Sequence, residues 1–109
     1  MTWNETISSK VFTKTSDAKT IITRWKAFND KVVFTNGCFD ILHLVHIDYV
    51  AKAADLGDRL VIGLNADTSV SRLKGENRPI IDQKTRAIKL ASLVFVDAVV
   101  IFQEDTTLN

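Results

Sequence analysis

Residues 31–57 have the sequence KVVFTNGCFDILHLVHIDYVAKAADLG, and this stretch decides the fold. It starts with an apolar, β-branched run, passes through the turn signal Asn36-Gly37, presents two histidines and continues as a helical pattern up to Gly57. A strand followed by a tight turn and a helix N-terminus brings backbone N–H groups and the positive end of the helix dipole to one place. Because that arrangement binds anions, most often phosphate groups, the stretch predicts a nucleotide phosphate site.

The rest of the chain alternates helical patterns with short apolar runs. Residues 1–15 are polar and lack a period, so we expect an extended lead-in there. The predicted strands are residues 31–35, 59–64 and 97–102. The predicted helices are one that Ser16-Asp17 caps and Asn29-Asp30 ends, one over about 44–56 with Gly57 as its left-handed stop, and one that Asp82 caps. The side chains expected to face the core from the first and last of these helices are Ile21, Ile22, Trp25 and Phe28, and Ile88, Ala91, Ser92 and Phe95.

This order of elements predicts an α/β fold, a Rossmann-like parallel sheet with flanking helices. Strands separated by helices need crossover connections, which make neighbouring strands parallel. We divide the chain into a lead-in and helix, residues 1–30, and a main domain, residues 31–109, whose C-terminal part is expected to be missing. Three strands would leave exposed sheet edges, which would also permit a homodimer.

Composition narrows the class of partner. At 109 residues the chain fits one domain, and its net charge of +1 argues against a nucleic-acid binder that works through bulk charge. No apolar run approaches the ~20 residues that span a bilayer, and no secretory signal is visible, so we expect no membrane partner. With one cysteine, Cys38, an internal disulfide is excluded, which suits a cytoplasmic protein.

His43 and His46 carry the sharpest chemical signal. They are the only histidines in the chain, and they stand three residues apart in the turn predicted to bind an anion. The alternative is a pair of solvated or structural histidines. A zinc site is a further alternative, because Cys38 and Asp40 lie nearby in the sequence. Four ligands would then come from nine residues, and Cys38 is explained as a small buried hydrophobe, so we expect no dedicated metal site.

Polar residues at the predicted strand ends are further candidates. Gly37 would let a ligand approach the backbone closely, whereas Asp40 would either cap the following turn or take part at the site. Asn65 and Asp67 could bind ligand hydroxyls, although Asp67 is better explained as the cap of a short helix.

Cations in the second half of the chain are candidates as well. Lys74 and Arg78 belong to a polar loop, residues 71–79, where they would be either solvated or part of a lid over a polyphosphate. Lys84 and Arg86 would occupy the first turn of a helix, where cations are mildly unfavourable. A nearby anion would reverse that sign, which hints that Arg86 contacts a ligand.

Four segments together resemble a known superfamily: TNGCFDILHLVH (35–46), GDRLVIGLNAD (57–67), RLKGENRP (72–79) and VDAVVIFQEDT (96–106). They are similar to the cytidylyltransferase-like nucleotidyltransferases, which carry a His-x-Gly-His motif. Within these, the sequence looks most like the D-glycero-β-D-manno-heptose 1-phosphate adenylyltransferases, which also form the C-terminal half of bifunctional heptose kinase/adenylyltransferases. The resemblance covers roughly residues 11–108, and the stand-alone form is expected because no kinase segment precedes it.

The resemblance implies an activity and site roles. The family transfers a nucleotidyl group from a nucleoside triphosphate to a sugar phosphate with release of pyrophosphate, with Mg²⁺ carried by the phosphates. Here this implies AMP transfer from ATP to heptose 1-phosphate, giving ADP-heptose for lipopolysaccharide cores. The implied roles are phosphate binding by Thr35, Asn36, Gly37 and Phe39, transition-state donation by His43 and His46, substrate contact by Asp67, and triphosphate contact by Lys74.

Two departures from the family pattern favour weakened activity. Val45 stands where the family has glycine, so its isopropyl group would crowd the nucleotide. Thr107 replaces a proline, and the later Ser/Thr-rich helix start is not present. The alternatives are therefore a nucleotide-binding module with little or no turnover, or a cytidylyltransferase that uses CTP and glycerol 3-phosphate.

Overall fold

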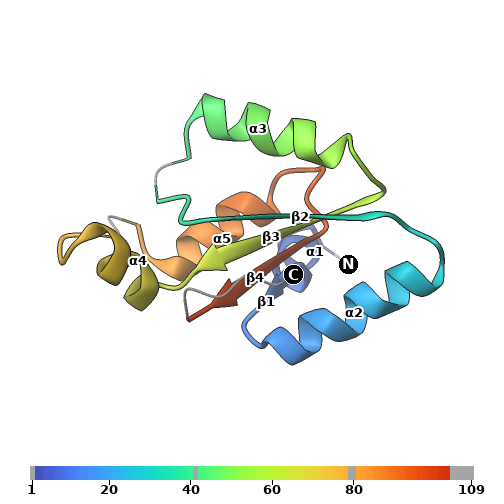
Figure 1. Ribbon diagram of the computed structural model, residues 1–109, viewed down its shortest axis with the longest axis horizontal. Coiled ribbons are helices and arrows are strands. Elements are labelled where there is room, and N and C mark those ends of the chain that lie inside the picture. The colour runs from blue at the N-terminus through green and yellow to red at the C-terminus, as the bar shows by residue number, and fades with distance from the viewer. Residues whose placement is uncertain (1, 41, 79–80, 104–109) are drawn as a thin grey trace.

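A parallel sheet organises the computed structural model, which describes residues 2–40, 42–78 and 81–103. Within these residues the sheet has four strands in the order β1-β4-β3-β2 (Figure 1). The strands are β1 (Val11–Phe12), β2 (Val32–Gly37), β3 (Arg59–Asn65) and β4 (Ala98–Phe102). Every neighbouring pair is parallel, and β2 pairs with β3 along its whole length. The predicted Rossmann-like α/β fold is confirmed.

Helices cover both faces of the sheet (Figure 1). They are α1 (Trp3–Ser9), α2 (Thr15–Ala27), α3 (Leu44–Ala54), α4 (Asp67–Lys74) and α5 (Gln83–Ala91). On one face, Val50 of α3 and Leu90 of α5 join Ile62 of the sheet in the larger buried cluster. On the other face, Ala18 and Ile22 of α2 pack in a second cluster. Alternate side chains of each central strand therefore enter opposite cores, which explains why these strands are apolar throughout.

The N-terminal segment differs from the expected extended lead-in. Residues 3–9 form α1, which begins at a capping box in which Thr2 and Glu5 exchange hydrogen bonds. Val11 and Phe12 then add strand β1 beside β4. Because β1 belongs to the same sheet and α2 packs on it, residues 2–30 form one packed unit with the rest of the described chain.

Gly57 has a different role from the one predicted. Helix α3 already ends at Ala54, and Gly57 does not have a positive φ angle. A Cβ at Gly57 would lie 2.7 Å from the backbone oxygen of Lys31 and 2.7 Å from Val33 Cγ2. Glycine is thus required by the close approach of the chain entering β3 to the start of β2, and a left-handed helix end is not involved.

Three further details correct the sequence prediction. Helix α5 turns Arg86, Ala87, Leu90 and Ala91 into the core, so the predicted apolar face is displaced. Phe28 follows α2 and is 76% exposed, although it was expected to pack. Lys74 lies in the last turn of α4, and the loop expected from residue 71 begins only at Gly75, whose φ of 110° ends the helix.

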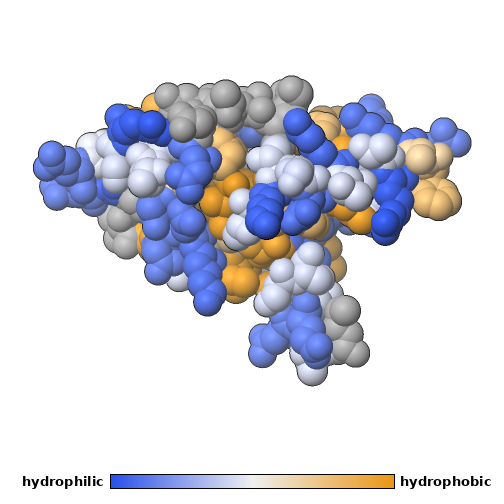
Figure 2. Space-filling model, turned by 90° about the horizontal axis from the view of Figure 1, so that it is seen from below, coloured by the Kyte–Doolittle hydropathy of each residue, from blue (hydrophilic) through white to orange (hydrophobic). Residues whose placement is uncertain are grey.

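The surface of the described residues has an apolar area and a shallow hollow. Viewed from below, the molecule exposes an apolar area near its centre between hydrophilic side chains (Figure 2). A hollow of about 420 Å³ is lined by Ser8, Val11, Thr13, Gln83, Lys84, Ile88 and Ile101, none of which is a predicted site residue. Among the described residues, no helix is both long enough and apolar enough to cross a bilayer.

Candidate functional site

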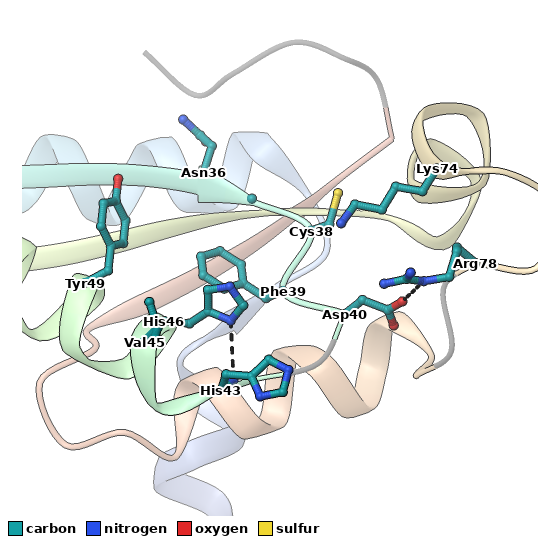
Figure 3. Close-up of a pocket in the computed structure, with 11 residues that line it drawn as sticks. Asn36, Cys38, Phe39, Asp40, His43, Val45, His46, Tyr49, Lys74 and Arg78 are labelled. Atoms are coloured by element: carbon teal, nitrogen blue, oxygen red, sulfur yellow. Dashed lines mark hydrogen bonds and ion pairs between the residues drawn. The ribbon is translucent and has the colours of Figure 1, made fainter.

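A cavity of about 630 Å³ opens where β2 ends and α3 begins. Figure 3 shows side chains from the β2 end, the following turn, α3 and the end of α4 around it. Its lining consists of Asn36, Gly37, Cys38, Phe39, Asp40, His43, Val45, His46, Tyr49, Lys74 and Arg78. Nine of the predicted site residues are thus brought together, whereas Thr35, Asn65, Asp67 and Arg86 lie outside the lining.

The two histidines border the same cavity. Their ring centroids are 5.9 Å apart, and the planes are tilted by 45°. His43 is exposed, and His46 is half-buried with its ring edge-on to Phe39 at 6.1 Å. The pair is therefore close enough to contact one small anionic group from two directions.

One backbone hydrogen bond orients the ring of His46. Its Nδ1 accepts a hydrogen bond from the backbone N–H of His43 at 3.3 Å. A neutral imidazole that accepts at Nδ1 carries its hydrogen on Nε2, so Nε2 becomes a donor. His43 is also the N-cap of α3, whose first turn contains no acidic residue. The positive end of this helix is thus available to an anion.

Two cations border the cavity on the side opposite α3 (Figure 3). Lys74 is exposed at the end of α4, and Arg78 is half-buried in the segment that follows. Arg78 Nε donates to Asp40 Oδ2 at 2.5 Å, and the side chain of Asp40 is only 1% exposed. The backbone N–H of Ile81 donates to the other carboxylate oxygen at 3.0 Å. Asp40 therefore holds Arg78 and the start of the next segment against the turn.

The turn after β2 is tightly packed. Phe39 has a φ of 46°, a left-handed conformation that is uncommon for a residue with a side chain. A Cβ at Gly37 would lie 2.8 Å from Phe39 Cε2, so glycine is needed for the ring to fold back over the turn. This packing places the Phe39 ring beside His46 and shapes the inner wall of the cavity.

The polar groups at the end of β3 do not line the cavity, and they are bonded to a buried arginine instead. Arg86 is 1% exposed, and its guanidinium donates to the backbone oxygens of Cys38, Asn65 and Ile81. Its Nη2 also bonds Asp67 Oδ1 at 2.8 Å. Asp67 does not cap α4, since Ala66 is the N-cap. The hint that Arg86 contacts a ligand is not supported by this placement, because protein groups occupy its donors.

Two lining residues were missed from the sequence. Cys38 was expected to be a buried hydrophobe but is half-exposed at the cavity. Tyr49 is 59% exposed, and its hydroxyl accepts a hydrogen bond from the buried Thr35 at 3.3 Å. Tyr49 follows Val45 by one helical turn, so this spacing on α3 was a usable signal. Thr35 itself does not line the cavity, and its hydroxyl contacts the lining residue Tyr49 from behind.

A zinc site, the alternative use of the two histidines, would need a cluster of ligands. Among the residues that the structure describes, no group of three or more His, Cys, Asp or Glu side chains is arranged to hold a metal ion. Thr107, Glu104 and Asp105 fall outside the described residues, as does Pro79 of the basic segment.

A family model described as Cytidylyltransferase-like matches residues 34–109, a range that contains the whole cavity lining. The chain belongs to the cytidylyltransferase-like family.

Curated relatives share the same stretch of sequence. Two proteins named Bifunctional protein HldE are 58% identical over 92 residues in Magnetococcus marinus and 67% identical over 79 residues in Campylobacter concisus. The matches cover 84% and 72% of this chain but only 19% and 17% of those proteins. This member of the cytidylyltransferase-like family thus spans about a fifth of the length of the curated relatives that it matches.

A solved structure supports the same fold. The lipopolysaccharide core biosynthesis protein from Thermoplasma volcanium superposes with a TM-score of 0.64 at 34% sequence identity. The match covers 72% of this chain and 63% of that one.

Proposed function

We propose that the chain is a nucleotidyltransferase domain that transfers AMP from ATP to a sugar 1-phosphate, with heptose 1-phosphate as the acceptor. The observation that supports this most is the meeting of His43 and His46 with Lys74 and Arg78 around one cavity at the end of β2. A volume of about 630 Å³ suits a nucleotide-sized ligand. The family match and the HldE relatives support the reaction type, and the heptose acceptor follows from the resemblance of the sequence motifs.

In the proposed reaction an oxygen of the sugar phosphate attacks the α-phosphorus of ATP. A new P–O bond forms, the bond from the α-phosphorus to the oxygen bridging the β-phosphorus breaks, and pyrophosphate leaves with that electron pair. His46 would donate from Nε2 to the α-phosphate oxygens, and His43 would donate beside it. Lys74 and Arg78 would neutralise the pyrophosphate side. Catalysis then rests on positioning and charge stabilisation, with no covalent enzyme intermediate.

Magnesium would accompany ATP in this proposal. Asp40 is the one carboxylate among the described lining residues, and it is already bonded by Arg78 and the Ile81 amide. The donor set therefore suits a Mg²⁺ ion held by phosphate oxygens and water more than one held directly by the protein. The ion would supply charge neutralisation on the phosphates.

Pyrophosphate release tests the proposal. We expect release from ATP that requires heptose 1-phosphate, is weaker with CTP and glycerol 3-phosphate, and is absent in the double variant His43→Ala/His46→Ala. Release with CTP and glycerol 3-phosphate alone would favour the cytidylyltransferase alternative. Equal release from the double variant would exclude the histidine roles.

Val45 favours a second candidate, a nucleotide-binding module with little turnover. Its side chain is 75% exposed and lines the cavity at the start of α3, between the two histidines in sequence. Binding of ATP by calorimetry without pyrophosphate release under any substrate pair would select this candidate. Calorimetry and the pyrophosphate assay use the same protein and the same nucleotide, so their results can be compared directly.

A further inference from the structure

Arg86 is the largest fully buried side chain of the described residues, and its charge lies inside the fold. The guanidinium makes four hydrogen bonds: Nε to Ile81 O at 2.9 Å, Nη1 to Cys38 O at 2.6 Å and to Asn65 O at 2.8 Å, and Nη2 to Asp67 Oδ1 at 2.8 Å. A guanidinium has five N–H donors in a fixed plane. Four of the five are therefore committed to protein acceptors.

These acceptors come from separate segments that surround the proposed nucleotide site. Cys38 belongs to the turn after β2, Asn65 ends β3, Asp67 begins α4, and Ile81 precedes α5. Since Arg86 is on α5, one side chain ties the carboxyl ends of two strands to the starts of two helices. Its position behind the turn is shown by the cavity lining, which includes Cys38 but not Arg86.

The bond to Cys38 has a consequence for the next amide. In a trans peptide the C=O and N–H groups point in opposite directions. Because the Cys38 carbonyl accepts from the buried Arg86, the N–H of Phe39 in the same peptide group points away from that guanidinium. The left-handed φ of Phe39 needs such external support, since a residue with a side chain does not favour it alone.

We propose that Arg86 is a positioning residue that fixes the backbone of residues 37–40 in its anion-binding shape. It holds the Cys38 carbonyl from behind and does not touch the ligand. Lysine cannot substitute, because its three donors radiate from one nitrogen and cannot reach four acceptors spread over a plane. The consequence for nucleotide binding rests on the function proposed above, whereas the effect on the turn itself does not.

Cys38 provides a local reporter, because it is the only cysteine and belongs to the turn that Arg86 holds. The experiment measures the rate of Cys38 alkylation by iodoacetamide in Arg86→Lys. The matched control is Leu90→Ala, which removes a buried side chain of the same helix that packs in the core. Circular dichroism and urea unfolding of each variant give the fraction unfolded, so that global opening can be subtracted.

We expect alkylation to accelerate by about tenfold or more in Arg86→Lys, because the turn opens locally once charge-assisted bonds are lost. Leu90→Ala should show the wild-type rate after subtraction. Unchanged alkylation in Arg86→Lys, or an equal acceleration in Leu90→Ala, would overturn the proposal. If Arg86→Lys does not fold, Asp67→Ala decides, because it removes one acceptor that is 40% exposed and should give a smaller acceleration. The wild-type rate in that variant would also overturn the proposal.

Calorimetry with ATP separates this inference from the proposed function. Weaker ATP binding in Arg86→Lys, together with faster Cys38 alkylation, supports both the positioning role and the proposed nucleotide site. Faster alkylation in a protein whose wild type does not bind ATP leaves the positioning role standing and removes the nucleotide site. Normal alkylation in a protein that binds ATP removes only the positioning role.

Discussion

The ends of β2 and β3 look alike in sequence but differ in structure. Both strands finish in a short polar cluster at the same edge of the sheet, Asn36-Gly37 in one case and Asn65-Ala66-Asp67 in the other. After β2 the chain folds around an open cavity, and the two histidines and two cations face it. After β3, Arg86 bonds the backbone oxygen of Asn65 and one carboxylate oxygen of Asp67, and neither residue lines the cavity. We call the β2 end the open end and the β3 end the closed end.

The difference shows that a place at the carboxyl edge of a parallel sheet does not by itself make a binding residue. Ligands of such folds bind at that edge. However, a buried guanidinium must also be hydrogen-bonded, and at the β3 end the polar groups serve as its acceptors and are not left for a ligand. The closed end then supports the open one, because the same guanidinium reaches the Cys38 carbonyl. Variants in the two ends should therefore fail in different ways.

The largest difference in kcat is expected between His46→Ala, at the β2 end, and Asp67→Asn, at the β3 end. Loss of a transition-state donor costs on the order of 10²–10³ in kcat. Asp67→Asn keeps an oxygen that can accept from Arg86, so turnover should stay near the wild-type level. Pyrophosphate release measured side by side provides the test. If Asp67→Asn is as damaging as His46→Ala, then the β3 end is part of the site and the comparison fails.

Val45→Gly should strengthen ATP binding at the cavity beside β2. Removing the isopropyl group from the cavity wall should tighten ATP binding by roughly ten- to a hundredfold, since a clash of that size costs typically 1–3 kcal/mol. Leu44→Gly is the matched control, because Leu44 is a 79% exposed neighbour on the same helix that does not line the cavity. Equal ATP affinity of Val45→Gly and the wild type, measured by calorimetry, would refute the crowding argument.

Much of the open end could be predicted because its residues are consecutive. The strand, turn and helix start all fall within residues 32–46, so local patterns suffice to bring Asn36, His43 and His46 together. The Rossmann-like sheet followed from the same alternation of apolar runs and helices. Lys74 was expected near a polyphosphate both as part of a polar loop and by resemblance. In the structure, α4 extends to Lys74, which lies in the segment 71–79 that was expected to be a loop.

The closed end could not be predicted in the same way. A sequence shows Arg86 as a cation in the first turn of a helix, and its burial depends on how α5 packs against two distant strand ends. The N-terminal elements were missed for other reasons. The Thr2-x-x-Glu5 capping box is a visible helix signal that was not used. By contrast, β1 has only two residues, too few to show a period.

Gly63→Ala should displace the side chain of Asn36 at the end of β2 and so disturb the cavity. A Cβ at Gly63 would overlap the Asn36 side-chain oxygen and approach Phe102 Cε1 to 3.2 Å, so Asn36 must move. We expect a loss of about 1–3 kcal/mol in unfolding free energy, together with weaker ATP binding. Gly57→Ala is the control, because it causes a similar clash near the start of β2 and should reduce stability alone. Urea unfolding measures the stability of both variants, and calorimetry measures their ATP affinity. An equal fall in ATP affinity in the two variants would contradict the prediction.

The smallest change in stability is expected for variants of Asp82, the N-cap of the helix that carries Arg86. Its carboxylate accepts the backbone N–H of Thr85 at 2.7 Å, and this bond lowers the pKa of Asp82 below its usual 3.8. A lowered pKa means that the carboxylate stabilises the fold above pH 3.8 and that this stabilisation is lost as the pH falls through the lower folded-state value. Asp82→Ala should therefore be less stable than the wild type at neutral pH, and the gap should shrink in acid.

Asp82→Asn separates the cap from its charge. Asparagine is as good an N-cap as aspartate but does not titrate in this range, so its stability relative to Asp82→Ala should not vary with pH. Urea unfolding of the wild type and both variants across the acid range measures the two gaps. A gap between wild type and Asp82→Ala that stays constant below pH 3.8 would show that the carboxylate does not cap α5 through its charge. Because Arg86 lies one turn into α5, the cap then stabilises the closed end only through the helix it begins.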